Sequence, residues 1–155
     1  MGSVKFRFEQ DPETVMNFVR DPDVIKRRGA ALGERNVEVV VDGGRVTTTR
    51  TVEAEVPGFA KKVLKPTNDV LEIKEWDLAA CSARLDVDVK GAPTRVTGTI
   101  RIVPDGTGSS YQIDYKITCS IPLIGKKIAE YADGLTAKGM REEYEWNKRE
   151  LDSRG

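Results

Sequence analysis

The feature that most constrains the fold is one long helical pattern near the C-terminal end, over residues 122–151. Small and apolar residues recur there at steps of three and four positions, which places them on one face of a helix, while charged residues occupy the other face. Pro122 suits the first turn, where a missing N–H costs little. At about 1.5 Å per residue, a helix of this length runs about 40 Å, the width of a small domain.

Almost everything before this helix has the pattern of β-strands. Residues 4–10 alternate between apolar and polar, as a half-buried strand does. Asp11-Pro12 and Asp21-Pro22 each combine an N-cap with a first-turn proline, so short helices are expected over 11–20 and 21–32. Six more strand-like segments follow, at 37–42, 45–56, 70–78, 84–90, 95–103 and 110–121. Joined by short turns, they predict an antiparallel meander with the long helix covering one face.

The strand expected at 70–78 breaks its own alternation. Leu71 and Ile73 share one phase, whereas Trp76 falls in the other. We expect a β-bulge near Lys74 and Glu75 to reconcile the two phases, with Leu71 and Ile73 facing the helix.

Composition restricts the function. The chain has 155 residues, which suits a single domain over 1–155, and its 25 basic and 25 acidic side chains cancel, which argues against a nucleic-acid partner. No apolar run approaches the length of a transmembrane helix, about 18 residues, and no secretory signal is recognised, so we expect a cytoplasmic protein with reduced cysteines. The chain has no histidine, the commonest general base and a frequent zinc ligand, so no catalytic residue, metal site or cofactor is predicted.

Five places in the sequence, together with the order of elements, carry a family resemblance. They are Val56-Pro57-Gly58-Phe59, Trp76, Gly91-Ala92-Pro93, Val96-Thr97-Gly98-Thr99 and Ile121-Pro122-Leu123-Ile124-Gly125. The order resembles the helix-grip fold of the START-like (SRPBCC) superfamily, which includes Bet v 1-type allergens, polyketide cyclases and lipid-transfer domains. The quoted residues are similar to those of a mainly actinobacterial START-like family, the bacterial domain-of-unknown-function family 2505. The resemblance implies an α+β helix-grip fold, with an antiparallel sheet wrapped on the C-terminal helix and an apolar cavity between them, and it implies no catalytic residues.

The inward positions of the strands and helix supply the residues expected to line that cavity. They are Phe6, Phe8, Arg50, Val52, Phe59, Leu64, Leu71, Ile73, Leu85, Val87, Ile100, Ile113, Tyr115, Ile117, Ile124, Ile128, Tyr131 and Leu135. The alternative is a filled core made of the same residues. Gly125, Gly134 and Gly139 each weaken the long helix, which indicates either close packing on the sheet or room for a ligand.

Arg50 stands in the apolar phase of its strand, where an unpaired charge is very costly. Its planar fork suits a bidentate acceptor, so one interpretation is an anchor for a ligand carboxylate. The other is a structural pair with Glu75 or Asp77, or an exposed strand end.

These features favour the non-catalytic binding or carriage of a hydrophobic small molecule or lipid. One alternative is a polyketide cyclase-like enzyme, in which a carboxylate or tyrosine replaces histidine as base. A second is a co-chaperone-like interaction module that uses an apolar outer sheet face. The connection 57–66 is bounded by prolines, and we expect its apolar side to close the cavity mouth. Its lysines, Lys61, Lys62 and Lys65, would face water or transiently contact an anionic membrane.

Overall fold

The fold consists of one antiparallel sheet and three α-helices, and the structure, a computed structural model, describes residues 2–154. The elements are β1 (Gly2–Phe8), α1 (Pro12–Arg20), α2 (Pro22–Ala31), β2 (Arg35–Asp42), β3 (Arg45–Glu53), the 3-10 turn η1 (Gly58–Ala60), β4 (Thr67–Asp77), β5 (Ser82–Lys90), β6 (Thr94–Asp105), β7 (Gly108–Cys119) and α3 (Gly125–Arg154). The strand order is β1-β7-β6-β5-β4-β3-β2, with every neighbouring pair antiparallel. The expected α+β arrangement is confirmed.

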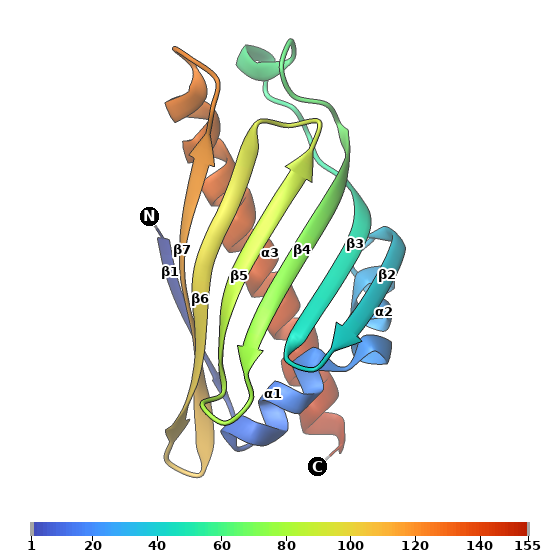
Figure 1. Ribbon diagram of the computed structural model, residues 1–155, viewed down its shortest axis with the longest axis vertical. Helices are drawn as coiled ribbons and strands as arrows, with labels where there is room; N and C mark the ends of the chain where they lie inside the picture. The colour runs from blue at the N-terminus through green and yellow to red at the C-terminus, as the bar shows by residue number, and fades with distance from the viewer. Residues whose placement is uncertain (1, 155) are drawn as a thin grey trace.

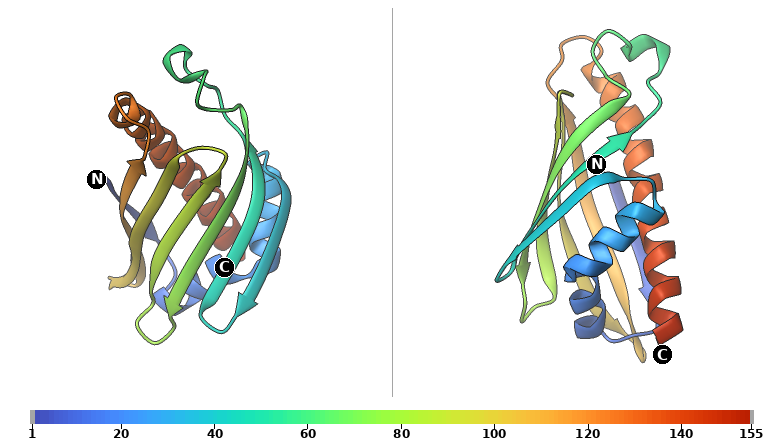
Figure 2. Two further views of the ribbon diagram at one scale, coloured as in Figure 1. Left: turned by 45° about the horizontal axis from the view of Figure 1, so that its top comes forward. Right: turned by 90° about the vertical axis from the view of Figure 1, so that its right-hand side faces the viewer.

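The sheet and α3 form two layers. In Figure 1 the twisted sheet lies in front of α3, and in the right-hand view of Figure 2 the sheet and α3 stand side by side, with α1 and α2 beside one end of the helix. We call the sheet face turned toward α3 the inner face and the opposite one the outer face.

The two short helices begin where the sequence indicates. The Asp11 side chain accepts a hydrogen bond from Thr14 N, and the Asp21 side chain accepts one from Asp23 N. A proline follows each cap, so both helix starts are confirmed.

The close-packed core lies at the end of the sheet nearest α1. Phe8, Val15, Val24 and Ile100 are almost fully buried there. Leu151 near the end of α3 is buried in the same cluster. This core fixes one end of the helix against the sheet.

Two sequence-based expectations about the elements are wrong. The register of β4 runs without interruption against β3 and β5, so no bulge lies near Lys74. The long helix begins at Gly125 rather than at Pro122, because Leu123 has φ 69°, a left-handed conformation that a right-handed helix does not accept.

Candidate functional site

The candidate site is a cavity of about 490 Å³ between the inner face of the sheet and α3. The buried residues of α3 are Gly125 and Ile128 at its start and Asn147 and Leu151 near its end. The helix is therefore held at both ends, and its middle spans the cavity.

One wall of the cavity is apolar. It comes from β5, β6 and β7, which contribute Leu85, Val87, Val96, Ile113 and Ile117. These positions alternate with outward-facing residues, as strands require. Across from them, the first half of α3 adds Ile128, Tyr131 and Leu135.

The other wall is charged. Arg50 of β3 and Glu72 and Lys74 of β4 face the cavity, together with Glu34 from the loop after α2. The closest atoms of Arg50 and Glu34 are 3.5 Å apart, those of Arg50 and Glu72 are also 3.5 Å apart, and Lys74 Nζ lies 3.6 Å from Glu72. We call Glu34, Arg50, Glu72 and Lys74 the ionic wall.

Two partners from the helices complete this polar side. The Arg28 Nη1 donates a 3.1 Å hydrogen bond to the Asn147 Oδ1, which ties α2 to α3. The Nε of Arg28 lies 4.0 Å from the carboxylate of Glu143, which also borders the cavity.

The two glutamates of the ionic wall are shifted in opposite directions. Burial raises the pKa of Glu72, but Lys74 and Arg50 more than offset it and lower the pKa to about 2. Burial raises the pKa of Glu34, and Arg50 opposes this shift without cancelling it. Glu72 is thus held ionised, while Glu34 takes up a proton more readily than a free glutamate.

Most of the residues predicted to line the cavity do so. They are Phe6, Phe8, Arg50, Val52, Leu64, Leu85, Val87, Ile100, Ile113, Ile117, Ile128, Tyr131 and Leu135. That they contact a ligand remains a prediction.

Five predicted residues lie elsewhere. Leu71 and Ile73 pair with outer-face threonines and aspartates, so their expected inward orientation is wrong. Tyr115 is buried, and its ring fills the space above Gly2 instead. Phe59 is partly exposed beneath the Lys127 ammonium, and Ile124 is half-buried immediately before α3.

The charged residues at the cavity that sequence reasoning missed include Glu34, Glu72, Lys74 and Glu143, and two of them, Glu72 and Lys74, lie on one strand. The broken alternation of β4 could have indicated that these charged residues face inward, but a β-bulge produces the same sequence pattern. The physical reason is that two opposite charges can replace apolar side chains on an inner face when they neutralise each other and face a cavity. Arg50 therefore pairs with Glu72, whereas Glu75 pairs with Arg45 on the outer face.

The three glycines of α3 differ in whether they allow close packing on the sheet or leave open space. A Cβ atom at Gly125 would lie 3.2 Å from Cys119 O, so this glycine serves close packing. A Cβ atom at Gly139 would meet nothing within 4 Å, although Gly139 borders the cavity. Gly134 has equally open space but faces solvent.

The 57–66 connection, where the mouth of the cavity is expected, lies beside the cavity and near the start of α3. Leu64 and Lys65 border the cavity. The Tyr131 hydroxyl donates a 2.7 Å hydrogen bond to the Glu55 carbonyl, which links α3 to the chain leaving β3. The Lys127 ammonium lies 4.4 Å from the centre of the Phe59 ring.

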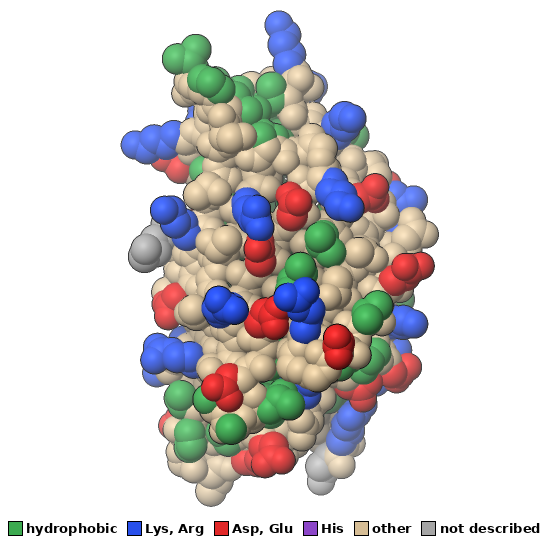
Figure 3. Space-filling view, in the orientation of Figure 1, with side chains coloured by type: hydrophobic (Ala, Val, Ile, Leu, Met, Phe, Trp, Pro, Cys, Tyr) green, Lys and Arg blue, Asp and Glu red, His purple; other side chains and the backbone are tan. Residues whose placement is uncertain are grey.

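The surface formed by this connection and the start of α3 combines exposed apolar and basic side chains. We call it the tip, and it comprises Phe59, Lys61, Lys62, Lys65, Leu123, Lys126 and Lys127. Leu123 is fully exposed at 102%. In Figure 3, hydrophobic and basic side chains gather at this end of the molecule.

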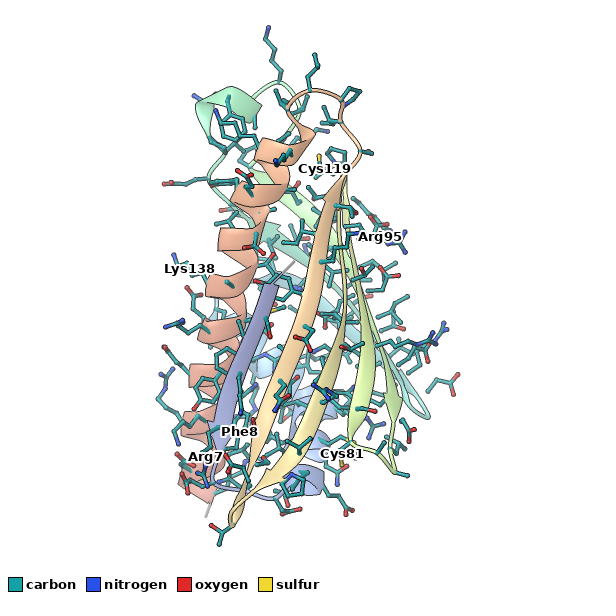
Figure 4. The ribbon with its side chains drawn as sticks, turned by 90° about the vertical axis from the view of Figure 1, so that its left-hand side faces the viewer. Arg7, Phe8, Cys81, Arg95, Cys119 and Lys138 are labelled. Atoms are coloured by element: carbon teal, nitrogen blue, oxygen red, sulfur yellow. The ribbon has the colours of Figure 1, made fainter. Side chains whose placement is uncertain are left out.

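The outer face of the sheet is a mixed, charged surface. Arg95 donates two hydrogen bonds to Asp86, at 2.9 and 2.6 Å, and Figure 4 shows Arg95 pointing away from α3. Figure 3 shows hydrophobic side chains scattered between charged ones on this face. The two cysteines lie at opposite ends of the sheet (Figure 4), and burial raises the pKa of the Cys81 thiol, which disfavours the reactive thiolate. None of the helices within residues 2–154 is long and apolar enough to cross a membrane.

Comparisons with known proteins agree with this geometry. Residues 3–149 match a family described as "Protein of unknown function (DUF2505)". Comparison with curated protein sequences gave no match. Similar solved structures include TTHA0849 from Thermus thermophilus (18% identity, TM-score 0.73, 99% of this chain and 97% of that one). They also include the Zhui aromatase/cyclase from Streptomyces sp. R1128 (12%, 0.67, 99% and 93%) and Ara h 8.0201 (10%, 0.65, 94% and 95%). The chain therefore belongs to the DUF2505 family of proteins of unknown function, and its fold is that of the Bet v 1/START-like proteins.

Proposed function

We propose that the protein binds a hydrophobic small molecule or lipid in the cavity between the sheet and α3, and carries it without changing it. The observation that supports this function is the cavity of about 490 Å³ beneath the middle of α3. Small-molecule sites typically measure about 300–1,000 Å³. The resemblance to the START-like proteins, which implies an apolar cavity between sheet and helix, also favours the proposal.

Native mass spectrometry of the protein purified from its own host tests this function. We expect a co-purified apolar molecule, and we expect it to be lost from a Gly139→Leu variant, whose new side chain would occupy the cavity. Gly134→Leu, on the solvent side of the same helix, is the matched control. A protein that carries no molecule, and also fails to bind a hydrophobic fluorophore, would refute the proposal.

We place ligand exchange at the mouth, with the 57–66 connection acting as a flap. Leu64 borders the cavity and Phe59 does not, so the two residues form an internal comparison. Leu64→Ala should raise the on- and off-rates of a fluorescent fatty acid, and Phe59→Ala should leave them unchanged. If Leu64→Ala lowers thermal stability without changing these rates, the segment is only a structural cap.

The tip supports transient contact with an anionic membrane during exchange. Each lysine near such a surface contributes about 1 kcal/mol, so Lys61→Gln together with Lys62→Gln should weaken binding to phosphatidylserine-containing vesicles about 30-fold. Leu123→Ser should weaken it further, because Leu123 is fully exposed. If the affinity for these vesicles stays the same after all three substitutions, the tip is not the contact surface.

A cyclase-like enzyme is the second candidate, and the ionic wall is the observation that favours it. Glu34 combines a raised pKa with a position beside Arg50, as a general acid requires. Incubation with a reactive poly-β-ketone separates the two functions. A carrier leaves the product distribution of the spontaneous reaction unchanged, whereas an enzyme changes it and loses this effect in Glu34→Gln.

A further inference from the structure

The ionic wall has hydrogen-bonding capacity that the protein itself leaves unused. Arg50 has five N–H donors. Its one side-chain hydrogen bond within residues 2–154 is a long one, from Nη2 to Glu72 at 3.5 Å. The buried Nε lies 3.5 Å from the Glu34 carboxylate but forms no hydrogen bond among the described residues.

Lys74 also has its carboxylate partner only at a long distance. Its Nζ lies 3.6 Å from Glu72, which exceeds the usual range of about 2.7–3.2 Å. The side chains of Arg50, Glu72 and Lys74 are only 12–14% exposed, so bulk water does not freely replace the missing contacts.

An ion pair on the outer face of the sheet, whose two side chains hydrogen-bond closely to each other, provides a comparison. Arg95 forms a bidentate contact with Asp86 at 2.9 and 2.6 Å, although both side chains are exposed. Long contact distances cost a buried ion pair more free energy than an exposed one, because buried charges have lost their hydration. Arg50 and Lys74 nevertheless keep longer distances, so, among the described residues, N–H donors that border the cavity remain free for a further acceptor.

The two walls also divide the cavity by polarity. The charged side chains of the ionic wall come from β3, β4 and the loop after α2, whereas β5, β6 and β7 present mainly apolar side chains to the cavity. A purely apolar ligand would leave the charges of Arg50 and Lys74 facing hydrocarbon. An amphipathic ligand would satisfy both walls together.

We propose that the ionic wall binds the carboxylate of an amphipathic acid, whose apolar body lies against β5–β7 and the first half of α3. This inference rests on the proposed function and names the class of its ligand. The Arg50 fork and the Lys74 ammonium donate to the carboxylate oxygens. Three cations, Arg28, Arg50 and Lys74, face three carboxylates here, those of Glu34, Glu72 and Glu143.

A fourth carboxylate can be accommodated because the pKa of Glu34, one of the three present, is raised. Burial raises the pKa of Glu34, and the neighbouring carboxylates of Glu143 and Glu72 add to this shift, while Arg50 and Arg28 oppose it. A ligand carboxylate beside Arg50 would raise that pKa further, so Glu34 takes up a proton as the acid binds.

The test compares 11-(dansylamino)undecanoic acid with its methyl ester, which share a fluorophore and an apolar chain. The protein should bind the acid about ten- to a hundredfold more tightly than the ester, as hydrogen bonds to a charged group allow. Arg50→Met should remove this preference, so that the variant binds the acid and the ester about equally well. Arg45→Met, on the outer face of the same strand and paired with Glu75, is the control that should retain the preference.

The outcomes separate the two proposals. If neither probe binds, the proposed function fails. If acid and ester bind the unmodified protein equally well, the cavity binds ligands but the carboxylate site is refuted, and this comparison needs no variant. Should Arg50→Met not fold, the double variant Arg50→Met/Glu34→Gln removes one charge of each sign and gives the same comparison. A preference for the acid that survives the loss of Arg50 also contradicts the assignment.

Discussion

Replacing Gly139 by alanine tests the space beneath α3. A glycine inside a helix costs about 1 kcal/mol relative to alanine. A Cβ atom at Gly139 meets nothing within 4 Å, so no steric cost opposes this gain. We expect Gly139→Ala to raise the free energy of unfolding by about 1 kcal/mol, and the melting temperature by about 2–4 °C for a chain of this size.

Gly134 provides the matched control, because it lies on the solvent side of the same helix with equally open space. Gly134→Ala should give the same increase of about 1 kcal/mol. The two sites are five residues apart, about 7.5 Å along the helix, so the double variant should gain about 2 kcal/mol.

Urea denaturation monitored by circular dichroism measures all three values. The reasoning is refuted if Gly139→Ala destabilises the protein while Gly134→Ala stabilises it. That result would mean that the middle of α3 rests directly on the sheet and that the cavity is filled in solution.

Three further predictions concern the mouth and the polar side of the cavity. Tyr131→Phe removes the hydrogen bond to Glu55 O, so it should lower the free energy of unfolding by about 0.5–1.5 kcal/mol and speed ligand release in stopped-flow fluorescence; unchanged release would exclude a latch. The raised pKa of Glu34 stabilises the fold below the unfolded pKa of 4.5, and this stability is lost as the pH rises through the folded pKa. Glu34→Gln should therefore gain stability relative to the unmodified protein as the pH rises. Denaturation curves at acidic and neutral pH check this, and a difference independent of pH would contradict it. Asn147→Ala leaves Arg28 without its buried acceptor and should cost about 1–3 kcal/mol in a thermal melt; a cost below about 0.5 kcal/mol would show that water replaces the amide.

Local patterns in the sequence were sufficient for the elements and their order. Asp11 and Asp21 cap helices wherever the rest of the chain lies, because a cap acts within three residues. The alternation in the strands from β5 to β7 identified Leu85, Ile113 and other cavity residues, since neighbouring side chains of a strand always point to opposite faces. The spacing of apolar residues likewise predicted α3, except that the helix begins and ends three residues later than expected, at Gly125 and Arg154.

Only the tertiary structure decided which face of β4 is buried and what the cavity holds. Hydrophobicity favours Leu71 and Ile73 as inner residues, but the structure turns Glu72 and Lys74 inward. This choice depends on Arg50 from the neighbouring strand, which is 22 residues away from Glu72 in the chain. A buried charge is tolerated only beside its partners, and partners from separate elements meet only when the sheet has formed. The polarity of the cavity is therefore a property of the assembled fold, because no local segment of the sequence contains all the charges that create it.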